Sequence, residues 1–488
     1  KPTLLPTAHG GVLTPSVIGV LSSGEIVVGQ TAKELRVTDP DACAWCFKRY
    51  MGQDRRLRLG TKEFTPHELS SLVLRSLRED ASAALGMNVT DAVITVPAYF
   101  NDHARQATRL AGEMAGLNVR RMINEPTAAA LVYGFHDRDD EKNIVVIDLG
   151  GGTFDVTVME VFEGTLEIRA SAGESLLGGE DFTDRIVSEV LNAENARLEI
   201  AELNDPLRVA RLRSECETAK RTLATAEHAS IRVPGEDGRF TENPKKFRID
   251  RTVFARLCDP LMQRIAGPIA RALRDAEMQP DEIDEVILVG GATRMDALRK
   301  FVEDYFGKPP VMRHNPDEVV ALGAAIQAAL IGDDAAVDDM VMTDVCPFTL
   351  GVEVAKELGG QVHSGYFSPV LHRNCTIPIS KEEIYSTMSA NQTSVTVKVY
   401  QGDARKVSDN VLLGELEVSP LPPGPAGSPF FIRFTYDVSG VLEVEAYASG
   451  GQKFRTILTN HVKGLLPKSI DAARRRIGEM KFYPRDDL

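Results

Sequence analysis

The sequence lacks most features of secreted, membrane-spanning or nucleic-acid-binding proteins. Its six cysteines, in 488 residues, are too few and too scattered for a disulfide scaffold, so reduced thiols are expected. No apolar run approaches the roughly 20 residues that span a bilayer, and no signal segment is recognisable at the start. The net charge of -14 disfavours nucleic acid and anionic membranes as partners. A cytoplasmic location is therefore the default expectation.

Two of the cysteines have the spacing of a redox motif. Cys43 and Cys46 flank two residues and lead into Phe47 and Lys48, where the pattern predicts a short helix. No second cysteine pair follows that would complete a zinc site. We therefore expect Cys43 and Cys46 to pack in the core, and a redox or metal-binding role is the alternative.

The organisation of the chain changes along its length, which suggests about three domains. Up to residue 331, apolar runs such as 92–96 and 286–289 alternate with helical periodicity, as in an α/β domain. Residues 332–344 carry five acidic residues and no helical stripe, and we interpret them as a linker.

The remainder of the chain predicts an all-β unit followed by a helix. Residues 394–400 alternate with period two, and strand-like runs at 432–436 and 441–447 bracket a turn. A helix is then predicted to begin near Pro467 and to stop at Pro484. Its apolar side chains fall on one face, at Ile470, Ala473, Ile477 and Met480.

A glycine-rich loop follows the buried strand predicted at 143–147. Three glycines stand between two aspartates, in the order Asp148, Gly150, Gly151, Gly152 and Asp155. Glycines let backbone N–H groups approach phosphate oxygens, and the carboxylates can hold a hydrated Mg²⁺ against those phosphates. The loop therefore predicts a phosphate site, and an ordinary tight turn is the alternative.

Further elements predict a nucleoside pocket. The pair Gly290 and Gly291 follows another buried strand, and Arg294 could lay its guanidinium on an aromatic base. A second pair, Gly178 and Gly179, precedes acidic residues. One helical face carries charged residues that could hold ribose and purine, or could simply be solvated: Glu217, Lys220 and Arg221. No Gly-Lys-Ser/Thr P-loop is present, which excludes that class of NTPase.

Six motifs occur in a fixed order along the chain: VITVPAYFND (93–102), INEPTAAALVYG (123–134), IDLGGGTFDV (147–156), LGGEDF (177–182), LVGGATRM (288–295) and NPDEVVALGAAIQAA (315–329). Together they resemble the DnaK-type seventy-kilodalton heat-shock chaperones. The phrases DVCPFTLGVEV (344–354) and KFYPRDDL (481–488) look similar to the specialised bacterial HscC branch.

The resemblance implies a fold and an activity. The fold is an α/β actin-like ATPase of two lobes, followed by a linker, a β-sandwich that clamps peptides and a helical lid. In this chain the boundaries would be 1–331, 332–344, 345–462 and 463–488. The activity is that of an ATP-dependent chaperone that uses ATP, ADP and Mg²⁺ and binds extended apolar peptides of unfolded clients.

The resemblance also implies roles in the nucleotide site. Asp148 and Asp155 would position Mg²⁺ through waters, Glu125 would order water near the metal, and Lys48 would support the attacking water. The phosphates would be held by Gly150, Gly151, Gly152 and Thr153. The nucleoside pocket would contain Gly178, Gly179, Glu217, Lys220, Arg221, Gly290, Gly291, Arg294 and Asp317, with Ala224 and Ala292 where the family usually has serine. Such a site needs no covalent intermediate, because an oriented water and stabilised phosphate oxygens suffice.

In the β unit the resemblance implies a peptide groove. Its pocket would be lined by Val352, Val354, Tyr385, Val395, Val397 and Ile432, and Ala355 with Met388 would arch over the peptide. The alternative is that alternating valines simply fill the core of a sandwich. Pro97 and Arg105 would couple the domains, and Arg121 and Asp344 would meet a J-domain co-chaperone. A nucleotide exchange factor is a further implied partner.

One family element has no counterpart here. The first strand and loop of the family, of the form Asp-Leu-Gly-Thr-Thr, should precede Lys1, while residues 12–20 already read as strand. We therefore expect a chain truncated at its N-terminus, and in most of its lid, with impaired ATP binding and hydrolysis. A nucleotide-independent peptide-binding holdase is the alternative. A sugar kinase or actin-like protein could share the nucleotide loops but would lack the β unit.

Overall fold

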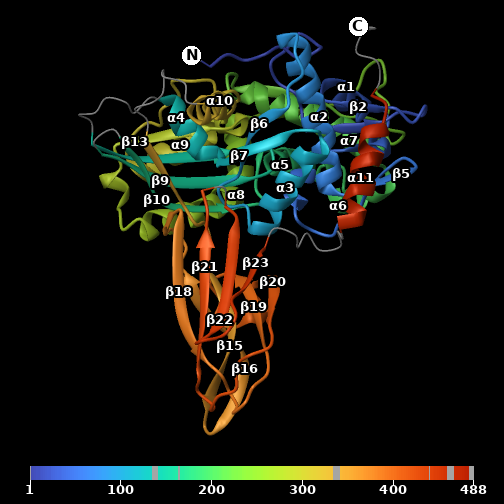
Figure 1. Ribbon diagram of the computed structural model, residues 1–488. Coiled ribbons are helices and arrows are strands. Elements are labelled where there is room, and N and C mark those ends of the chain that lie inside the picture. The colour runs from blue at the N-terminus through green and yellow to red at the C-terminus, as the bar shows by residue number, and fades with distance from the viewer. Residues whose placement is uncertain are drawn as a thin grey trace.

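The computed structural model describes residues 2–133, 141–162, 165–332, 341–438, 440–458 and 467–482. An α/β body lies above an elongated β domain, and the last helix, α11 (Pro467–Glu479), runs along the side of the body (Figure 1). Among the described residues, no helix is long and apolar enough to cross a membrane.

The elements of the body follow the predicted α/β alternation. Its helices are α1 (Gln30–Leu35), α2 (Pro66–Leu85), α3 (Asp102–Met114), α4 (Glu125–Tyr133), α5 (Gly179–Asn192), α6 (Leu198–Asn204), α7 (Pro206–Leu223), α8 (Arg251–Asp275), α9 (Asp296–Phe306) and α10 (Val319–Ile331), with short 3-10 helices η1 (Pro40–Ala42), η2 (Phe47–Tyr50), η3 (Pro280–Glu282) and η4 (Gly291–Arg294). Its strands are β1 (Ile18–Val20), β2 (Ile26–Val28), β3 (Cys43–Ala44), β4 (Leu57–Leu59), β5 (Lys62–Phe64), β6 (Asp91–Val96), β7 (Asn118–Asn124), β8 (Lys142–Leu149), β9 (Phe154–Phe162), β10 (Thr165–Glu174), β11 (His228–Arg232), β12 (Lys246–Asp250) and β13 (Glu285–Val289).

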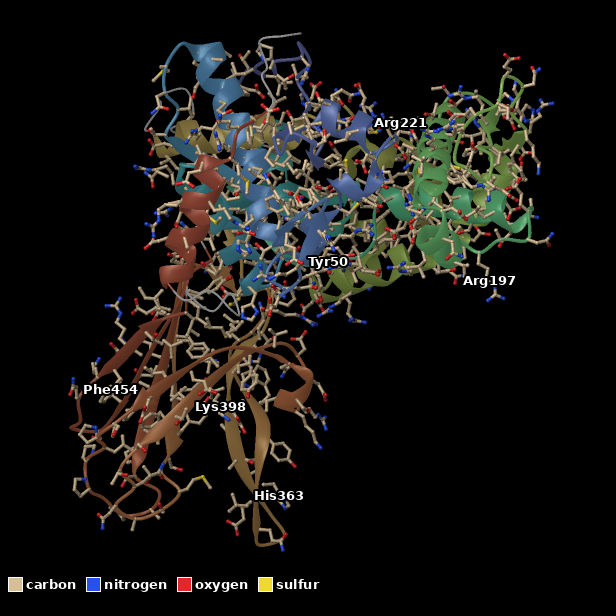
Figure 2. The ribbon with its side chains drawn as sticks, turned by 90° about the vertical axis from the view of Figure 1, so that its right-hand side faces the viewer. Tyr50, Arg197, Arg221, His363, Lys398 and Phe454 are labelled. Atoms are coloured by element: carbon tan, nitrogen blue, oxygen red, sulfur yellow. The ribbon has the colours of Figure 1, made fainter. Side chains whose placement is uncertain are left out.

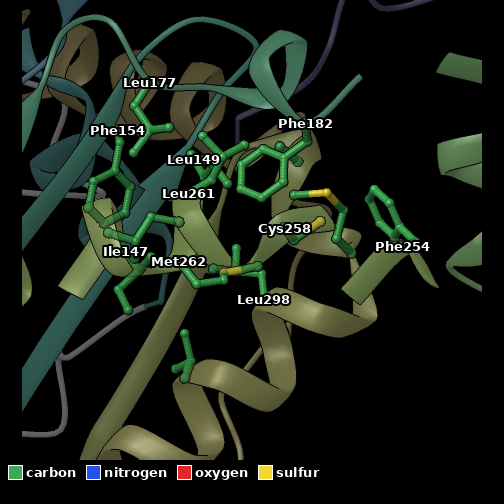
Figure 3. Packing of buried hydrophobic residues seen from close by; sticks show 14 of the residues in the cluster. Ile147, Leu149, Phe154, Leu177, Phe182, Phe254, Cys258, Leu261, Met262 and Leu298 are labelled. Atoms are coloured by element: carbon green, nitrogen blue, oxygen red, sulfur yellow. The ribbon is translucent and has the colours of Figure 1, made fainter. Parts of the chain in front are cut away.

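A six-stranded sheet with the order β13-β8-β9-β10-β14-β17 organises the body, and its last two strands are β14 (Val341–Val345) and β17 (Thr376–Ile377). Residues 144–149 of β8 are buried, because helices cover both faces of the sheet. On one face, Leu149 and Phe154 pack with Phe182 of α5 and Leu261 of α8 (Figure 3). On the other face, α4 contributes Ala129 and Ala130 to a separate cluster. The glycine loop thus leaves the sheet from a rigid, buried strand.

Several expected elements are confirmed and one is wrong. The runs at 92–96, 144–147 and 286–289 form β6, β8 and β13, and the short helix expected at Phe47 is η2. The strand expected from residue 12 begins only at Ile18, because Pro15 has no N–H to offer to a ladder. Of the expected linker, 333–340 lie outside the described residues, whereas Val341–Val345 form a strand, β14.

The β domain is a sandwich, as expected. One sheet has the order β16-β15-β19-β20 and the other has the order β18-β21-β22-β23. The period-two prediction for 394–400 is confirmed as far as Val399, but Tyr400 is buried as well, at a register shift between these two residues. Burial also alternates along β21 and β22. The elements are β15 (Leu350–Leu358), β16 (Gln361–Leu371), β17 (Thr376–Ile377), β18 (Ile379–Ser386), β19 (Val395–Gln401), η5 (Val407–Asp409), β20 (Val411–Val418), β21 (Pro429–Tyr436), β22 (Leu442–Ala448) and β23 (Phe454–Ile457).

The strand β14 connects the two parts of the chain. It pairs in parallel with β10 of the body and antiparallel with β17. Ion pairs support this junction: Arg373 lies 2.9 Å from Asp275, and Arg271 lies 2.8 Å from Asp403. The β domain extends away from the body, with His363 near its far end (Figure 2).

The apolar face predicted for the last helix packs against the body. Ile477 is fully buried, and Ile470, Ala473 and Met480 pack against the same cluster. Arg75 of α2 donates to the Ile477 and Met480 carbonyl oxygens at 2.9 and 3.1 Å, and Arg476 pairs with Glu68. The proposed stop at Pro484 lies outside the described residues.

Candidate functional site

The predicted phosphate loop is a closed turn between β8 and β9. Asp148 and Asp155 are direct partners in the antiparallel register of these strands. Within the turn, the Gly150 N–H donates to the Thr153 carbonyl oxygen at 3.1 Å. This geometry places both carboxylates at the base of the loop.

The glycine pair Gly178 and Gly179 lies against this loop, although the two segments are separated in the sequence. The Gly179 N–H donates to the Gly150 carbonyl oxygen at 2.9 Å. A Cβ on Gly178 would lie 2.4 Å from the Gly152 nitrogen, so only glycine allows this approach. Two of the predicted glycine elements therefore form one backbone surface.

Lys48 and Glu125 meet beside the loop. The Lys48 ammonium lies 2.6 Å from the Glu125 carboxylate. Desolvation opposes its charged form, but Glu125, Asp148 and Asp155 together raise the pKa of Lys48. Here η2 supplies the lysine and the first residue of α4 supplies the glutamate.

The two aspartates carry unbalanced negative charge. Asp155 is 1% exposed and Asp148 is 6% exposed. Burial and the Glu125 carboxylate raise the pKa of Asp155 to about 7, and burial, Glu125 and Asp155 raise the pKa of Asp148 well above its ordinary value. A cation would relieve this repulsion.

The donor set fits a hydrated cation better than a directly ligated one. In the part of the chain that the structure describes, no group of three or more His, Cys, Asp or Glu side chains could hold a metal ion. Two carboxylates suit Mg²⁺, which keeps several of its waters and binds through few protein ligands.

A cavity of about 420 Å³ lies next to the glycine loops, within the range of small-ligand sites. It is lined by most of the predicted nucleoside residues and a few others: Leu13, Gly151, Gly179, Glu180, Glu217, Lys220, Arg221, Ala224, Gly291, Ala292, Arg294, Met295 and Asp317. The structure thus brings four separate sequence motifs together around one space.

Charged groups in this cavity are held in fixed positions. Lys220 lies 2.6 Å from Glu217 and donates to the Gly179 carbonyl oxygen at 2.7 Å. Burial alone would raise the pKa of Glu217, but Lys220, Thr183 and Arg221 lower it to about 2. Arg294 lies 3.0 Å from Asp317. The alternative of a freely solvated charged face therefore does not describe Glu217 and Lys220.

Sequence reasoning missed several residues of this site. Arg49 donates to the Gly152 carbonyl oxygen at 2.8 Å and pairs with Asp181, so it ties the phosphate loop to α5. The Tyr99 N–H donates to Asp155 Oδ1 at 2.8 Å. These contacts join residues far apart in the sequence, so no local pattern predicts them. The one feature that could have pointed to Arg49 is its position directly after Lys48.

The predicted peptide-groove residues gather in one cluster of the β domain. Val352, Val397 and Ile432 are buried, and Val354, Tyr385 and Val395 pack against them at partial exposure. The Tyr385 hydroxyl donates to Ser368 Oγ at 3.2 Å. Ala355 and Met388 are exposed, Met388 by 62%. This arrangement fits both a groove and an ordinary core.

The predicted coupling residues lie between the body and β14. Arg105 is buried and donates to the Ala98 carbonyl oxygen at 3.1 Å and to Asn124 Oδ1 at 2.6 Å. Asn124, which was missed, donates in turn to Asp344 at 2.8 Å. Burial raises the pKa of Asp344, with Arg105 and Arg121 acting in the opposite direction. Pro97, also buried, accepts from the Phe100 N–H through its carbonyl oxygen at 3.1 Å.

Comparison with known proteins covers both parts of the chain. Residues 53–483 match the family model described as Hsp70 protein. The chain is 40% identical over 489 residues to the chaperone protein DnaK of Thermotoga petrophila and to that of Thermotoga maritima, which covers 99% of this chain and 80% of each relative. It is 39% identical, with the same coverage, to the chaperone protein DnaK of Thermosipho melanesiensis.

Proposed function

We propose residue roles on one premise: the chain belongs to the Hsp70 family, and it is therefore an ATP-dependent chaperone that binds ATP or ADP, hydrolyses ATP and acts on client peptides together with co-chaperones. The observation that carries the assignment is the Lys48–Glu125 contact of 2.6 Å beside the loop between Asp148 and Asp155. Lys48, Glu125 and the glycine loop thus bring a cation, a carboxylate and backbone donors together at one place.

The phosphates of ATP lie on the N–H groups of residues 151–153 in this proposal, because the Gly150 N–H is already bonded within the turn. Lys48 stabilises charge on the phosphate oxygens, and Glu125 orients the attacking water. Asp148 and Asp155 hold a hydrated Mg²⁺, which when bound neutralises the developing negative charge. The nucleoside occupies the cavity lined by Gly179, Glu217, Lys220, Arg221, Gly291, Arg294 and Asp317. The other two predicted glycines, Gly178 and Gly290, do not line it and lie against Gly152 and Leu149.

Extended apolar peptides bind the β domain in this proposal. The aliphatic cluster around Val354 and Val395 supplies the pocket, while Ala355 and Met388 close over the peptide backbone. The family resemblance further supports a cytoplasmic protein whose co-chaperones are a J-domain protein and a nucleotide exchange factor, with ATP binding coupled to the peptide grip through Pro97, Arg105 and Asp344.

Release of a fluorescent peptide on addition of ATP tests this proposal. Asp344→Ala removes the acceptor of the Asn124 hydrogen bonds, so it should slow ATP-triggered release about tenfold while basal hydrolysis changes little. Asp409→Ala, in the exposed η5 turn, is the matched control. Unchanged release by the Asp344 variant would refute the coupling role.

The J-domain contact has a separate test. Arg121 acts electrostatically on Asp344, which supports a shared role for the two residues in binding a J-domain. Arg121→Glu should abolish stimulation of hydrolysis by a J-domain and leave unstimulated hydrolysis intact. Full stimulation of this variant would remove Arg121 from the proposal.

A further inference from the structure

Two cysteines face each other where the β domain joins the body. The antiparallel register of β14 and β17 pairs Asp344 with Ile377 and Val345 with Thr376, and Cys346 and Cys375 adjoin this ladder directly. The Cys346 N–H donates to the Cys375 carbonyl oxygen at 2.9 Å. The Asn374 N–H donates in turn to the Cys346 carbonyl oxygen at 2.7 Å, so two backbone hydrogen bonds hold the segments of the two cysteines side by side.

The two thiols differ in their access to solvent. Cys346 is 1% exposed, whereas Cys375 is partly exposed. Cys375 lines an open polar cavity of about 720 Å³ between the body and the β domain, together with Asp275, Arg373 and Asp403. A small solute can therefore reach Cys375 directly, whereas Cys346 is buried and does not line this cavity.

The surroundings also favour the thiolate of Cys375. The neighbouring Cys346 side chain lowers the pKa of Cys375, burial opposes this effect, and Lys381 adds to it. At the other cysteines burial has the opposite result: it raises the pKa of Cys43 to about 12, of Cys46 to about 11 and of Cys258 to about 12. Peroxides react with thiolates, so Cys375 is the favoured target.

We propose that Cys375 and Cys346 form a peroxide-sensitive dithiol, in which Cys375 is oxidised first and Cys346 resolves the product into a disulfide. The Cys375 thiolate attacks one oxygen of hydrogen peroxide, the O–O bond breaks, and a sulfenic acid and hydroxide result. The Cys346 sulfur then attacks the Cys375 sulfur, the S–S bond forms and a second hydroxide leaves. Each hydroxide becomes water by taking up a thiol proton, so the thiols lose two electrons and the peroxide gains them.

Oxidation would change a contact between the domains. The Cys346 thiol donates to the Phe348 carbonyl oxygen at 3.1 Å, and the disulfide has no proton to donate. The Phe348 ring packs on Tyr99 of the body at a centroid distance of 4.7 Å, and the Tyr99 N–H holds Asp155. We therefore expect the oxidised form to lose coupling between nucleotide and peptide, an effect that rests on the proposed function, whereas formation of the disulfide does not.

Mass spectrometry on the full chain tests the chemistry. After hydrogen peroxide treatment, alkylation and digestion without reductant, a peptide pair joined through Cys346 and Cys375 is expected. Cys346→Ser should instead accumulate a sulfenic acid on Cys375 that dimedone traps, and Cys375→Ser should give neither product. In the reduced protein, iodoacetamide should label Cys375 about tenfold faster than Cys46, which is the internal comparison. Equal labelling, or no joined peptide, would overturn the proposal.

Peptide release tests the consequence. Peroxide should slow ATP-triggered release about tenfold, dithiothreitol should restore it, and Cys375→Ser should be insensitive to peroxide. If the disulfide forms while release is unchanged, the regulatory role is overturned. If the reduced protein also fails to release peptide on ATP, the proposed function fails instead, and the mass spectrum still decides the disulfide. Circular dichroism of each variant excludes misfolding as the cause.

Discussion

Asn124 donates from its side-chain amide to both carboxylate oxygens of Asp344, at 2.8 and 2.9 Å. The next residue, Glu125, holds the Lys48 ammonium at 2.6 Å. One step along the backbone therefore separates a contact to the connecting strand β14 from a contact in the proposed hydrolytic site. Arg105 also donates to Asn124 and so holds its side chain in place. A movement of β14 would therefore displace Asn124 and, with it, the start of α4.

Loss of the Lys48 ammonium should affect hydrolysis more than nucleotide binding. Lys48→Ala removes a cation that stabilises charge on the phosphate oxygens, so single-turnover hydrolysis should slow about 100-fold or more. Affinity for Mg-ATP, measured by calorimetry, should change far less. Lys300→Ala, on the exposed face of α9, is the matched control. Normal turnover by the Lys48 variant would contradict its assigned role.

A methyl group in the phosphate loop should block nucleotide without disturbing the fold. A Cβ at Gly151 would have no protein atom within 4 Å, so the free energy of unfolding of Gly151→Ala should stay within about 0.5 kcal/mol of the parent. The same methyl group would stand where phosphate approaches the backbone, and Mg-ATP affinity should fall about tenfold or more. Gly267→Ala in α8, which also meets no protein atom, controls for the substitution itself. Equal affinity in both variants would argue for an ordinary turn.

Without divalent cations, stability should fall as the pH rises towards neutrality. The pKa of Asp155 is raised from its ordinary 3.8 to about 7, so between these values the folded protein keeps a proton that the unfolded chain has lost. The free energy of unfolding then decreases with pH, by up to about 1.4 kcal/mol per unit from this group. Urea unfolding in EDTA at several pH values measures the slope.

The control for this pH dependence is Asp155→Asn, which cannot ionise and should show a smaller slope. Added Mg²⁺ should flatten the slope of the parent and leave that of the variant nearly unchanged, because a cation favours the ionised carboxylate. Parallel slopes for the two proteins would mean that Asp155 does not titrate in this window.

Two positions in the β domain separate a peptide contact from a core residue. Met388 is 62% exposed, so Met388→Ala should leave stability unchanged and weaken peptide binding several-fold. Val397 is 3% exposed, so Val397→Ala should cost about 1 to 2 kcal/mol of stability by opening a cavity. Fluorescence anisotropy with an apolar peptide and chemical unfolding measure the two effects. Undiminished peptide affinity in the Met388 variant would remove it from the proposed arch.

Local features of the fold were predictable because neighbouring residues create them. The alternation along 395–399 and the apolar face of α11 both follow from side-chain spacing. The surface that α11 covers was not predictable, because an apolar face specifies burial and not a partner. The strand expected from residue 12 begins only at Ile18, because Pro15 interrupts the apolar run, so the length of such a run overestimates the length of the strand.

The sequence by itself determined that a loop of three glycines between Asp148 and Asp155 suits phosphate, because spacing and side-chain size are local properties. Only the tertiary structure decided which distant groups meet there. It brought Lys48 to Glu125, Gly178 to Gly152 and, at the domain junction, Cys346 to Cys375. Such pairings depend on how the sheets and helices of the entire chain pack, and no short stretch of residues contains that information.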